Sequence, residues 1–355
     1  MILVTGGTGL VGAHLLHHLI KNDETVRAIY RSEEKIKSVK KVFSYYTDDA
    51  SLFSKIEWFK ADITDIPSMI PAFVGIEKVY HCAAFISFNP KDYREMRKVN
   101  IHGTAIIVNL SIDAKVKKLC FVGSIASVGD AIKGELITEA NEWNKELDNS
   151  GYSITKFGAE MEVWRASQEE VAVVIVNPGI ILGSGFWFAS SGKLFSQVYK
   201  GLKYFTEGIT GFVGVKDVVK AMVSLMDSDI KNERFLLVSE NKSYKEIFFL
   251  IADAFGKKRP SKKIKVWQTN LLWRVSSLLS LCTRKEPLLS KYSAKSAHQV
   301  SKYSSKKIKE IMNFQFEEIK IVIQNVCNDY ETSVAKPFSL KGIINKEQDV
   351  PVKKK

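Results

Sequence analysis

The sequence predicts an α/β fold, in which a doubly wound parallel sheet is joined to a smaller, mostly helical C-terminal region. Two observations support this prediction. In the N-terminal half, short apolar segments alternate with segments of helical periodicity, and after Pro178 the sequence turns rich in glycine and aromatic residues before a basic, helical stretch from 241 to 330. Nearly continuous apolar strands are typical of sheets buried on both faces, and strand–helix alternation is typical of parallel sheets.

Strands are expected in six apolar segments. These are residues 2–6, 25–30, 56–62, 78–84, 118–124 and 171–177. Helices are expected between them, because apolar residues recur there at i, i+3 and i+4, as in 10–22 and 100–116.

The composition is that of an ordinary globular protein, with 45% hydrophobic and 26% charged residues, and 355 residues are enough for about two domains. The net charge is +13, but the lysines are scattered and no basic helix with interleaved aromatic residues accompanies them, so we expect no nucleic-acid partner. The four cysteines lie far apart, which predicts reduced thiols and no metal site. The start, MILVTGG, lacks the pattern of a secretory signal, and we expect a cytoplasmic protein.

The segment 269–282 is apolar but contains Arg274 and several serines. It is too polar and too short for a membrane-spanning helix. We favour a helix that caps the substrate site, and a helix that lies on a membrane surface is the alternative.

A glycine-rich turn follows the first expected strand and opens the first helix. It contains Gly6, Gly9 and Gly12 in the segment ILVTGGTGLVGAHL. The first glycine permits a tight turn, the second permits close approach of a pyrophosphate, and the third permits close helix–strand packing. Phosphates would then contact the N–H groups at the positive end of the helix, so the turn predicts a Rossmann-type dinucleotide site.

The residue at the end of the second strand distinguishes the two nicotinamide cofactors. A carboxylate at this point binds the ribose hydroxyls of NAD, whereas an arginine favours the 2′-phosphate of NADP. The strand here ends in Tyr30-Arg31-Ser32. We therefore expect NADP(H) in preference to NAD(H), with Arg31 as the phosphate ligand.

Six motifs in order resemble the extended short-chain dehydrogenase/reductase family, also called the NAD-dependent epimerase/dehydratase family. They are TGGTGLVG (5–12), ADITD (61–65), HCAA (81–84), VNIHGT (99–104), FVGSIAS (121–127) and YSITK (152–156). The resemblance implies that Asp62 binds the adenine amino group and that the HCAA segment lines the cofactor. In full, the cofactor contacts it implies are Gly6, Gly9, Leu10, Val11, Gly12, Arg31, Asp62, Ile63, Cys82, Ala83, Ala84, Tyr152, Lys156 and Pro178.

The resemblance also implies a catalytic set of Ser124, Tyr152, Lys156 and Asn100. Tyr152 would be the general acid/base, and Ser124 would hydrogen-bond the substrate oxygen. Lys156 would hold the nicotinamide ribose and, with the oxidised cofactor, lower the tyrosine pKa toward neutrality. Asn100 would act on Lys156 through a water molecule.

Two segments favour a reductase over a nucleotide-sugar enzyme within this family. SIASVGD (124–130) stands where sugar epimerases usually have VYG after the serine, and NPGIILGSG (177–185) stands in place of RxxNVYGP. Both look more like dihydroflavonol reductases, cinnamoyl reductases and 3β-hydroxysteroid dehydrogenases, which act on bulky apolar carbonyls or alcohols. We expect an NAD(P)-dependent carbonyl reductase or secondary alcohol dehydrogenase for a hydrophobic small molecule. A nucleotide-sugar epimerase or dehydratase with retained NAD, and a cofactor-sensing binding protein, are the alternatives.

The substrate pocket is expected where the fourth and sixth strands end, because ligands bind at the carboxyl edge of such sheets. Its candidate residues are Phe85, Phe88, Ser124, Phe186 and Trp187, with core packing as the alternative for the aromatic ones.

The expected domains are a nucleotide-binding domain of residues 1–178 plus about 212–240, and a substrate-binding region of about 179–211 plus 241–335, followed by a flexible basic tail at 336–355. Family members commonly dimerise through the two helices that begin here near Asn100 and Tyr152, so the resemblance implies a homodimer.

Overall fold

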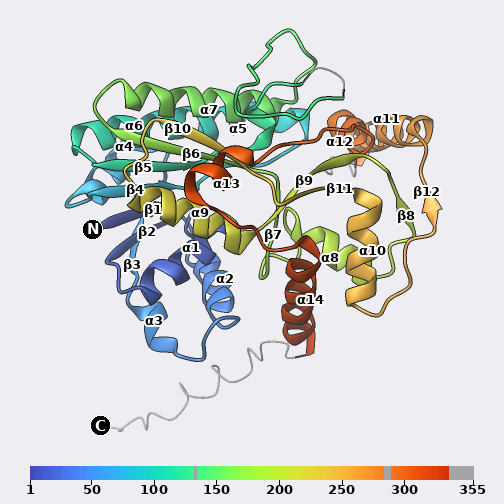
Figure 1. Ribbon diagram of the computed structural model, residues 1–355, viewed down its shortest axis with the longest axis horizontal. Coiled ribbons are helices and arrows are strands. Elements are labelled where there is room, and N and C mark those ends of the chain that lie inside the picture. The colour runs from blue at the N-terminus through green and yellow to red at the C-terminus, as the bar shows by residue number, and fades with distance from the viewer. Residues whose placement is uncertain (132–133, 284–288, 336–355) are drawn as a thin grey trace, which may run out of the picture.

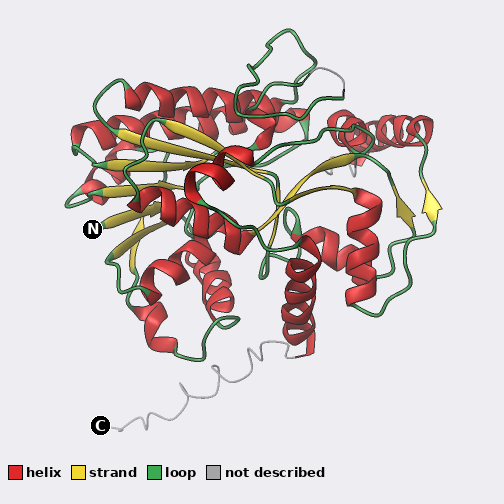
Figure 2. Cartoon of the chain, in the orientation of Figure 1, coloured by secondary structure: helices red, strands yellow, loops and turns green. Residues whose placement is uncertain are grey.

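The computed structural model describes residues 1–131, 134–283 and 289–335. The predicted basic tail at 336–355 lies outside these residues. A large parallel sheet with helices on both faces forms one side of the molecule, and a smaller region of helices and short strands forms the other (Figures 1 and 2).

Seven strands, all parallel, form the central sheet in the order β10-β6-β5-β4-β1-β2-β3. Their bounds are β1 Ile2–Thr5, β2 Val26–Tyr30, β3 Glu57–Lys60, β4 Lys78–His81, β5 Lys118–Val122, β6 Ala172–Pro178 and β10 Glu233–Leu237. The six predicted strands are therefore confirmed, and β10 extends the sheet beyond β6. The strand order reverses between β1 and β4, and ligands of doubly wound sheets bind at such a reversal.

Two layers of helices cover the sheet and account for the near-continuous apolar strands. On one face lie α1 Leu10–Lys21, α2 Glu33–Phe43, α3 Ala50–Ser54 and α9 Val215–Asp227. On the other lie α4 Ile66–Met69, α5 Tyr93–Arg97, α6 Gly103–Asp113 and α7 Gly151–Ser167. All four residues of β1 are buried, as expected for a central strand covered on both sides.

The second region is mainly helical, as predicted, but it also contains short strands. Its helices are α8 Gly192–Tyr199, α10 Tyr244–Ala254, α11 Val266–Thr283, α12 Lys291–Ser296, α13 Lys306–Met312 and α14 Ile319–Ala335. A three-stranded sheet in the order β11-β9-β7 and a two-stranded pair join them, formed by β7 Ile180–Leu182, β8 Tyr204–Phe205, β9 Ile209–Gly214, β11 Glu240–Ser243 and β12 Lys262–Lys263. No helix among the described residues is long and apolar enough to cross a bilayer.

Candidate active site

The glycine turn between β1 and α1 is held in place by close backbone contacts. Gly6 has φ +68°, and a Cβ at this position would lie 2.5 Å from the backbone nitrogen of Ala83. A Cβ on Gly12 would lie 2.3 Å from the carbonyl oxygen of Gly6. Both positions therefore require glycine for the fold itself.

Gly9 differs from the other two glycines. It precedes the first turn of α1, and a Cβ there would meet only the Gly6 carbonyl oxygen, at 3.4 Å. The first N–H groups of a helix have no partner within the helix, and the first turn of α1 contains no acidic residue. The chain's own packing thus does not demand glycine at this position. A pyrophosphate that rests on the N-terminus of α1 would demand glycine at this position. The turn therefore fits a dinucleotide.

Arg31 and Asp62 lie together where β2 and β3 end. Arg31 Nη1 is 3.6 Å from Asp62 Oδ2, while Asp62 Oδ1 accepts hydrogen bonds of 2.9 Å from the backbone N–H and the hydroxyl of Thr64. Partial burial acts to raise the pKa of Asp62, but the Thr64 hydrogen bonds and the Arg31 charge outweigh it and hold the pKa below its ordinary value. Asp62 is therefore an ionised acceptor, and Arg31 is 55% exposed and accessible to an anion. The side chain of the neighbouring Ile63 is buried, and a Cβ on Gly103 would lie 2.8 Å from it.

The chain after β4 passes the glycine turn. Cys82 donates its backbone N–H to the Thr5 carbonyl and is half-buried, and burial raises the pKa of its thiol to about 12 although Lys156 opposes the shift. The thiol is therefore neutral. Ala83 is half-buried and Ala84 is exposed, so this segment presents an apolar surface beside Gly6.

Asn100 fastens this segment to α7. Its Oδ1 accepts from the Phe85 N–H at 2.7 Å, and its Nδ2 donates to the Phe85 carbonyl at 2.9 Å and to Thr155 Oγ1 at 3.1 Å. The side chain is 1% exposed and bonds the residue before Lys156, not Lys156 itself. Its predicted action on Lys156 through water stays a prediction.

His81 was expected only as part of the HCAA segment, and its role as a buried residue that links β1, β4 and α6 was missed. Thr5 Oγ1 lies 2.6 Å from His81 Nδ1, and Thr104 Oγ1 lies 2.9 Å from His81 Nε2. Burial, with the Lys156 charge, lowers the pKa of His81 to about 3, so the ring is neutral. Thr104 donates its hydroxyl proton to the Asn100 carbonyl at 2.5 Å, which leaves it to accept from Nε2–H, while Nδ1 accepts from Thr5.

Ser124, Tyr152 and Lys156 meet at the carboxyl end of β5. Ser124 follows that strand and lies near the hydroxyl of Tyr152, which is in the first turn of α7. The helix begins here because Ser150 accepts the backbone N–H of Ser153 at 3.1 Å as an N-cap. Lys156 follows one turn later and is 2% exposed. Its Nζ donates to the Val122 carbonyl at 2.8 Å and lies 4.4 Å from the Phe121 ring centre. The structure thus brings the three residues together.

Burial sets the direction of the pKa shift at both Tyr152 and Lys156. Burial raises the pKa of Tyr152 above its ordinary value, and the hydrogen bond from Ser124 opposes this only in part. Burial also lowers the pKa of Lys156 to about 8, against the charge of Glu160. In the chain by itself, desolvation therefore dominates at both groups. The expectation that the ammonium and the oxidised cofactor together bring the phenol toward neutrality stays a prediction.

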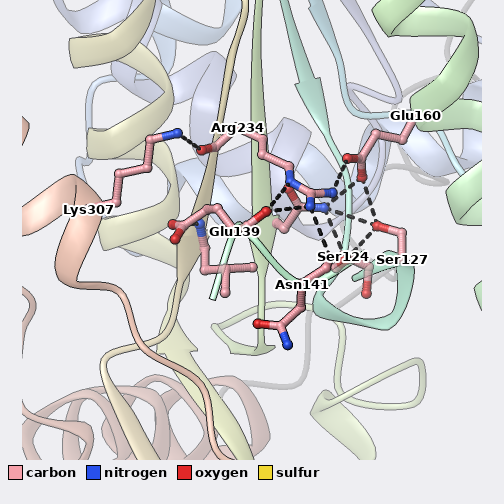
Figure 3. Close-up of polar contacts among 9 residues, drawn as sticks. Ser124, Ser127, Glu139, Asn141, Glu160, Arg234 and Lys307 are labelled. Carbon is pink, nitrogen blue, oxygen red and sulfur yellow. Dashed lines mark hydrogen bonds and ion pairs between the residues drawn. The ribbon is translucent and has the colours of Figure 1, made fainter. Parts of the chain in front are cut away.

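A buried network behind Ser124, shown in Figure 3, was also missed. Ser127 Oγ lies 2.7 Å from the Ser124 carbonyl oxygen and 2.8 Å from Glu160 Oε2, and Asn177 Nδ2 lies 3.1 Å and 2.9 Å from the same two atoms. Arg234 pairs with Glu160 Oε1 at 3.2 Å. Glu160 stands four residues after Lys156, so one helix presents the lysine and anchors the serine loop. Arg234 comes from β10, and no local pattern connects it to α7.

Only part of the expected aromatic pocket lies near Tyr152. The Phe88 ring is 45% exposed and its centre is 5.7 Å from that of Tyr152. Phe85 is half-buried and packs against the core between the sheet and α6.

The predictions for Phe186 and Trp187 are corrected. Trp187 is 6% exposed, packs edge-on against Tyr45 and Tyr330, and donates its indole N–H to Ser333 at 3.3 Å, so it belongs to the core of the second region. Phe186 packs against the core on the α1 face of the sheet. The β7–α8 loop turns back toward α2 and α14, which buries Trp187 and half-buries Phe186.

Comparisons with known proteins agree with the motifs. Residues 2–237 match the model of the NAD dependent epimerase/dehydratase family. Sterol demethylase protein B of Methylococcus capsulatus is 29% identical over 263 residues, covering 73% of this chain and 75% of that protein, and anthocyanidin reductase of Arabidopsis thaliana is 26% identical over 72% of this chain and 80% of its own. The crystal structure of gox2253 superposes with a TM-score of 0.76 at 22% identity, over 94% of this chain and 98% of that one. Because the family model spans more than half of the chain and its motifs converge at the β1–β4 edge, the chain belongs to the NAD-dependent epimerase/dehydratase family.

Proposed function

We propose that this protein is an NADPH-dependent oxidoreductase that interconverts a carbonyl group and a secondary alcohol on a hydrophobic small molecule. The observation that carries the proposal is the convergence of Ser124, Tyr152 and Lys156 beside the glycine turn. The exposed Phe88 ring next to Tyr152 suits an apolar substrate. One relative by sequence, anthocyanidin reductase, is named for a reduction.

In the proposed reduction, Tyr152 gives its phenolic proton to the substrate oxygen while Ser124 donates a hydrogen bond to the same oxygen. A raised pKa keeps the phenol protonated at neutral pH, as this direction requires. The bound cofactor would supply the hydride. Lys156 uses one of its three N–H donors on Val122, which leaves two donors for ribose hydroxyls.

We expect Arg31→Ala to weaken NADPH binding by roughly tenfold or more, because an exposed charged hydrogen bond to a phosphate is lost. NADH affinity should change little, since the arginine meets no phosphate there. Titration of both cofactors by fluorescence measures this. Lys37→Ala, in the exposed part of α2, is the matched control. Equal losses for both cofactors would show that Arg31 does not read the 2′-phosphate.

The glycine turn offers a paired test. Gly9→Ala is expected to keep the melting temperature near that of the parent, because the new methyl group has room within the chain. Its dinucleotide affinity is expected to fall by on the order of 100-fold, because the methyl group has no room beneath a pyrophosphate. Gly12→Ala is expected to destabilise the fold by about 2 kcal/mol or more, because its Cβ overlaps the Gly6 carbonyl. Thermal melts and cofactor titration separate the two. Undiminished binding by Gly9→Ala would remove the phosphate site from this turn.

The substrate class is tested by following NADPH absorbance against a panel of apolar ketones and aldehydes. Net cofactor consumption is the expected result. NAD that copurifies, with turnover of nucleotide sugars and no net consumption, would instead establish an epimerase or dehydratase. Ligand-dependent binding to another protein without turnover would favour a cofactor sensor. We also propose that the protein forms a homodimer through α6 and α7, where Ile154 and Met161 are exposed. We further propose a cytoplasmic location, where Cys82 and Cys120 stay reduced.

A further inference from the structure

Helix α11 has its apolar side chains outside and polar ones inside. Large apolar side chains along it are strongly exposed, with Val266 at 55%, Trp267 at 62%, Leu271 at 54%, Leu272 at 51%, Val275 at 44% and Leu278 at 64%. Thr269 and Ser280, in contrast, are only 4% and 5% exposed. A helix of a globular protein normally buries its apolar face and exposes its polar one. A continuous exposed apolar surface indicates a site of interaction.

The exposed side chains form a stripe along one side of the helix. Trp267, Leu271, Val275 and Leu278 are spaced by four, four and three residues, which places them on one face. Helix α11 has 18 residues and is about 27 Å long, and the stripe from Trp267 to Leu278 takes up about 17 Å of it. The inner face is fixed by hydrogen bonds, since Thr269 Oγ1 lies 3.0 Å from His298 Nε2 and Ser276 Oγ accepts the Leu289 N–H at 3.3 Å. Figure 1 shows α11 at the outer edge of the second region, away from the central sheet.

The surroundings of the stripe are basic. Between residues 255 and 283 the sequence contains seven lysines and arginines and no acidic residue. Lys262 and Lys265, just ahead of the helix, are exposed, and so is Arg274 within it. Lys263 pairs with Glu207. An apolar stripe bordered by cations complements a surface that is apolar below and anionic above.

We propose that α11 docks this protein on an anionic lipid surface, with the stripe entering the boundary between headgroups and acyl chains and the flanking lysines contacting lipid phosphates. The helix lies on the surface and does not cross it, in line with its limited apolarity. A symmetric contact between two copies through the same stripe would bring like-charged flanks together, which disfavours a second copy as the occupant.

Docking through α11 would hold the neighbourhood of Tyr152 near the lipid. α12 packs against α11, and its Lys291 donates at 3.1 Å to Asp148, four residues before Tyr152. An apolar substrate dissolved in the bilayer would then have a short path to the site. Docking itself does not depend on the proposed reaction.

The test is cosedimentation of the full chain with vesicles of phosphatidylcholine alone and of phosphatidylcholine mixed with phosphatidylglycerol. The full chain is expected to bind the mixed vesicles, to bind neutral vesicles more weakly, and to dissociate as salt is raised. Trp267→Ser/Leu271→Ser/Leu278→Ser is expected to lower the partition coefficient by on the order of 100-fold, because three apolar side chains no longer leave water. Lys262→Glu/Lys265→Glu is expected to abolish the preference for the anionic vesicles.

The matched control is Ile66→Ser/Ile70→Ser/Val74→Ser, which removes three comparably exposed apolar side chains at 51%, 54% and 70% from another surface. It should bind vesicles like the parent. Failure of the parent to bind mixed vesicles, or an equal loss in the control, would overturn the proposal. So would an α11 variant that changes only the sedimentation coefficient of the free protein, because the stripe would then be a contact between copies.

Discussion

Replacing Tyr152 with phenylalanine is expected to lower turnover by on the order of 1000-fold while cofactor affinity changes by less than about threefold. The ring stays beside Phe88, and only the phenolic hydroxyl near Ser124 is lost. The proton for the substrate oxygen then has no positioned donor. Steady-state kinetics with NADPH and an apolar ketone, together with cofactor titration, measure both quantities.

The control for this variant is Tyr204→Phe, in β8, where the ring is 47% exposed and lies outside the site. It should match the parent in turnover. Melting curves of both variants guard against a folding defect, since the loss of one hydrogen bond costs about 1 kcal/mol. Turnover retained by Tyr152→Phe would remove this residue from the chemistry and leave only the fold and the dinucleotide site.

Replacing Lys156 with methionine is expected to abolish turnover and at the same time to stabilise the cofactor-free chain. The ammonium is almost fully buried, and burial lowers its pKa from 10.5 to about 8. A lowered lysine pKa means that the folded state disfavours the charged form. Stability is therefore lost as the pH falls from 10.5 to about 8, where the unfolded chain is protonated and the folded chain is not, and at pH 7 the charge costs about 3 kcal/mol.

Methionine removes this cost but leaves the Val122 carbonyl without its donor, so we expect a net gain of about 1–3 kcal/mol in the free energy of unfolding at pH 7. The gain should shrink toward zero above about pH 10, where the lysine of the parent is neutral. Denaturant unfolding at several pH values measures it. Lys145→Met, at an exposed position, should show neither effect. A gain independent of pH would assign the stabilisation to packing and not to the buried charge.

Much of the site could be predicted from the sequence, because its signals are local. Gly6 and Gly12 are glycines because the turn itself leaves no room for a Cβ, and the spacing of Tyr152 and Lys156 is fixed by one helical turn. Buried parallel strands show in the sequence as apolar runs, so the six strands could be placed without a structure.

The partners of a buried polar group are set by topology and not by spacing. Arg234 reaches Glu160 only because β10 lies next to β6 in the sheet, and Asn100 bonds Phe85 and Thr155 across three elements. The pKa of Tyr152 is similar in this respect, because the packed surroundings that desolvate the phenol come from distant segments.

The sequence by itself determined the α/β fold, the glycine turn and the identity of the serine, tyrosine and lysine, since each depends on short-range geometry. Only the tertiary structure decided which apolar residues are covered. An aromatic cluster after β6 has the same pattern whether it lines a pocket or a core, and the packing of α14 made Trp187 a core residue. Likewise, the periodicity of α11 marks two faces but does not say which one the rest of the chain will cover. Its polar face was covered, because Thr269 and Ser276 find hydrogen-bond partners there, and its apolar face was left to the solvent.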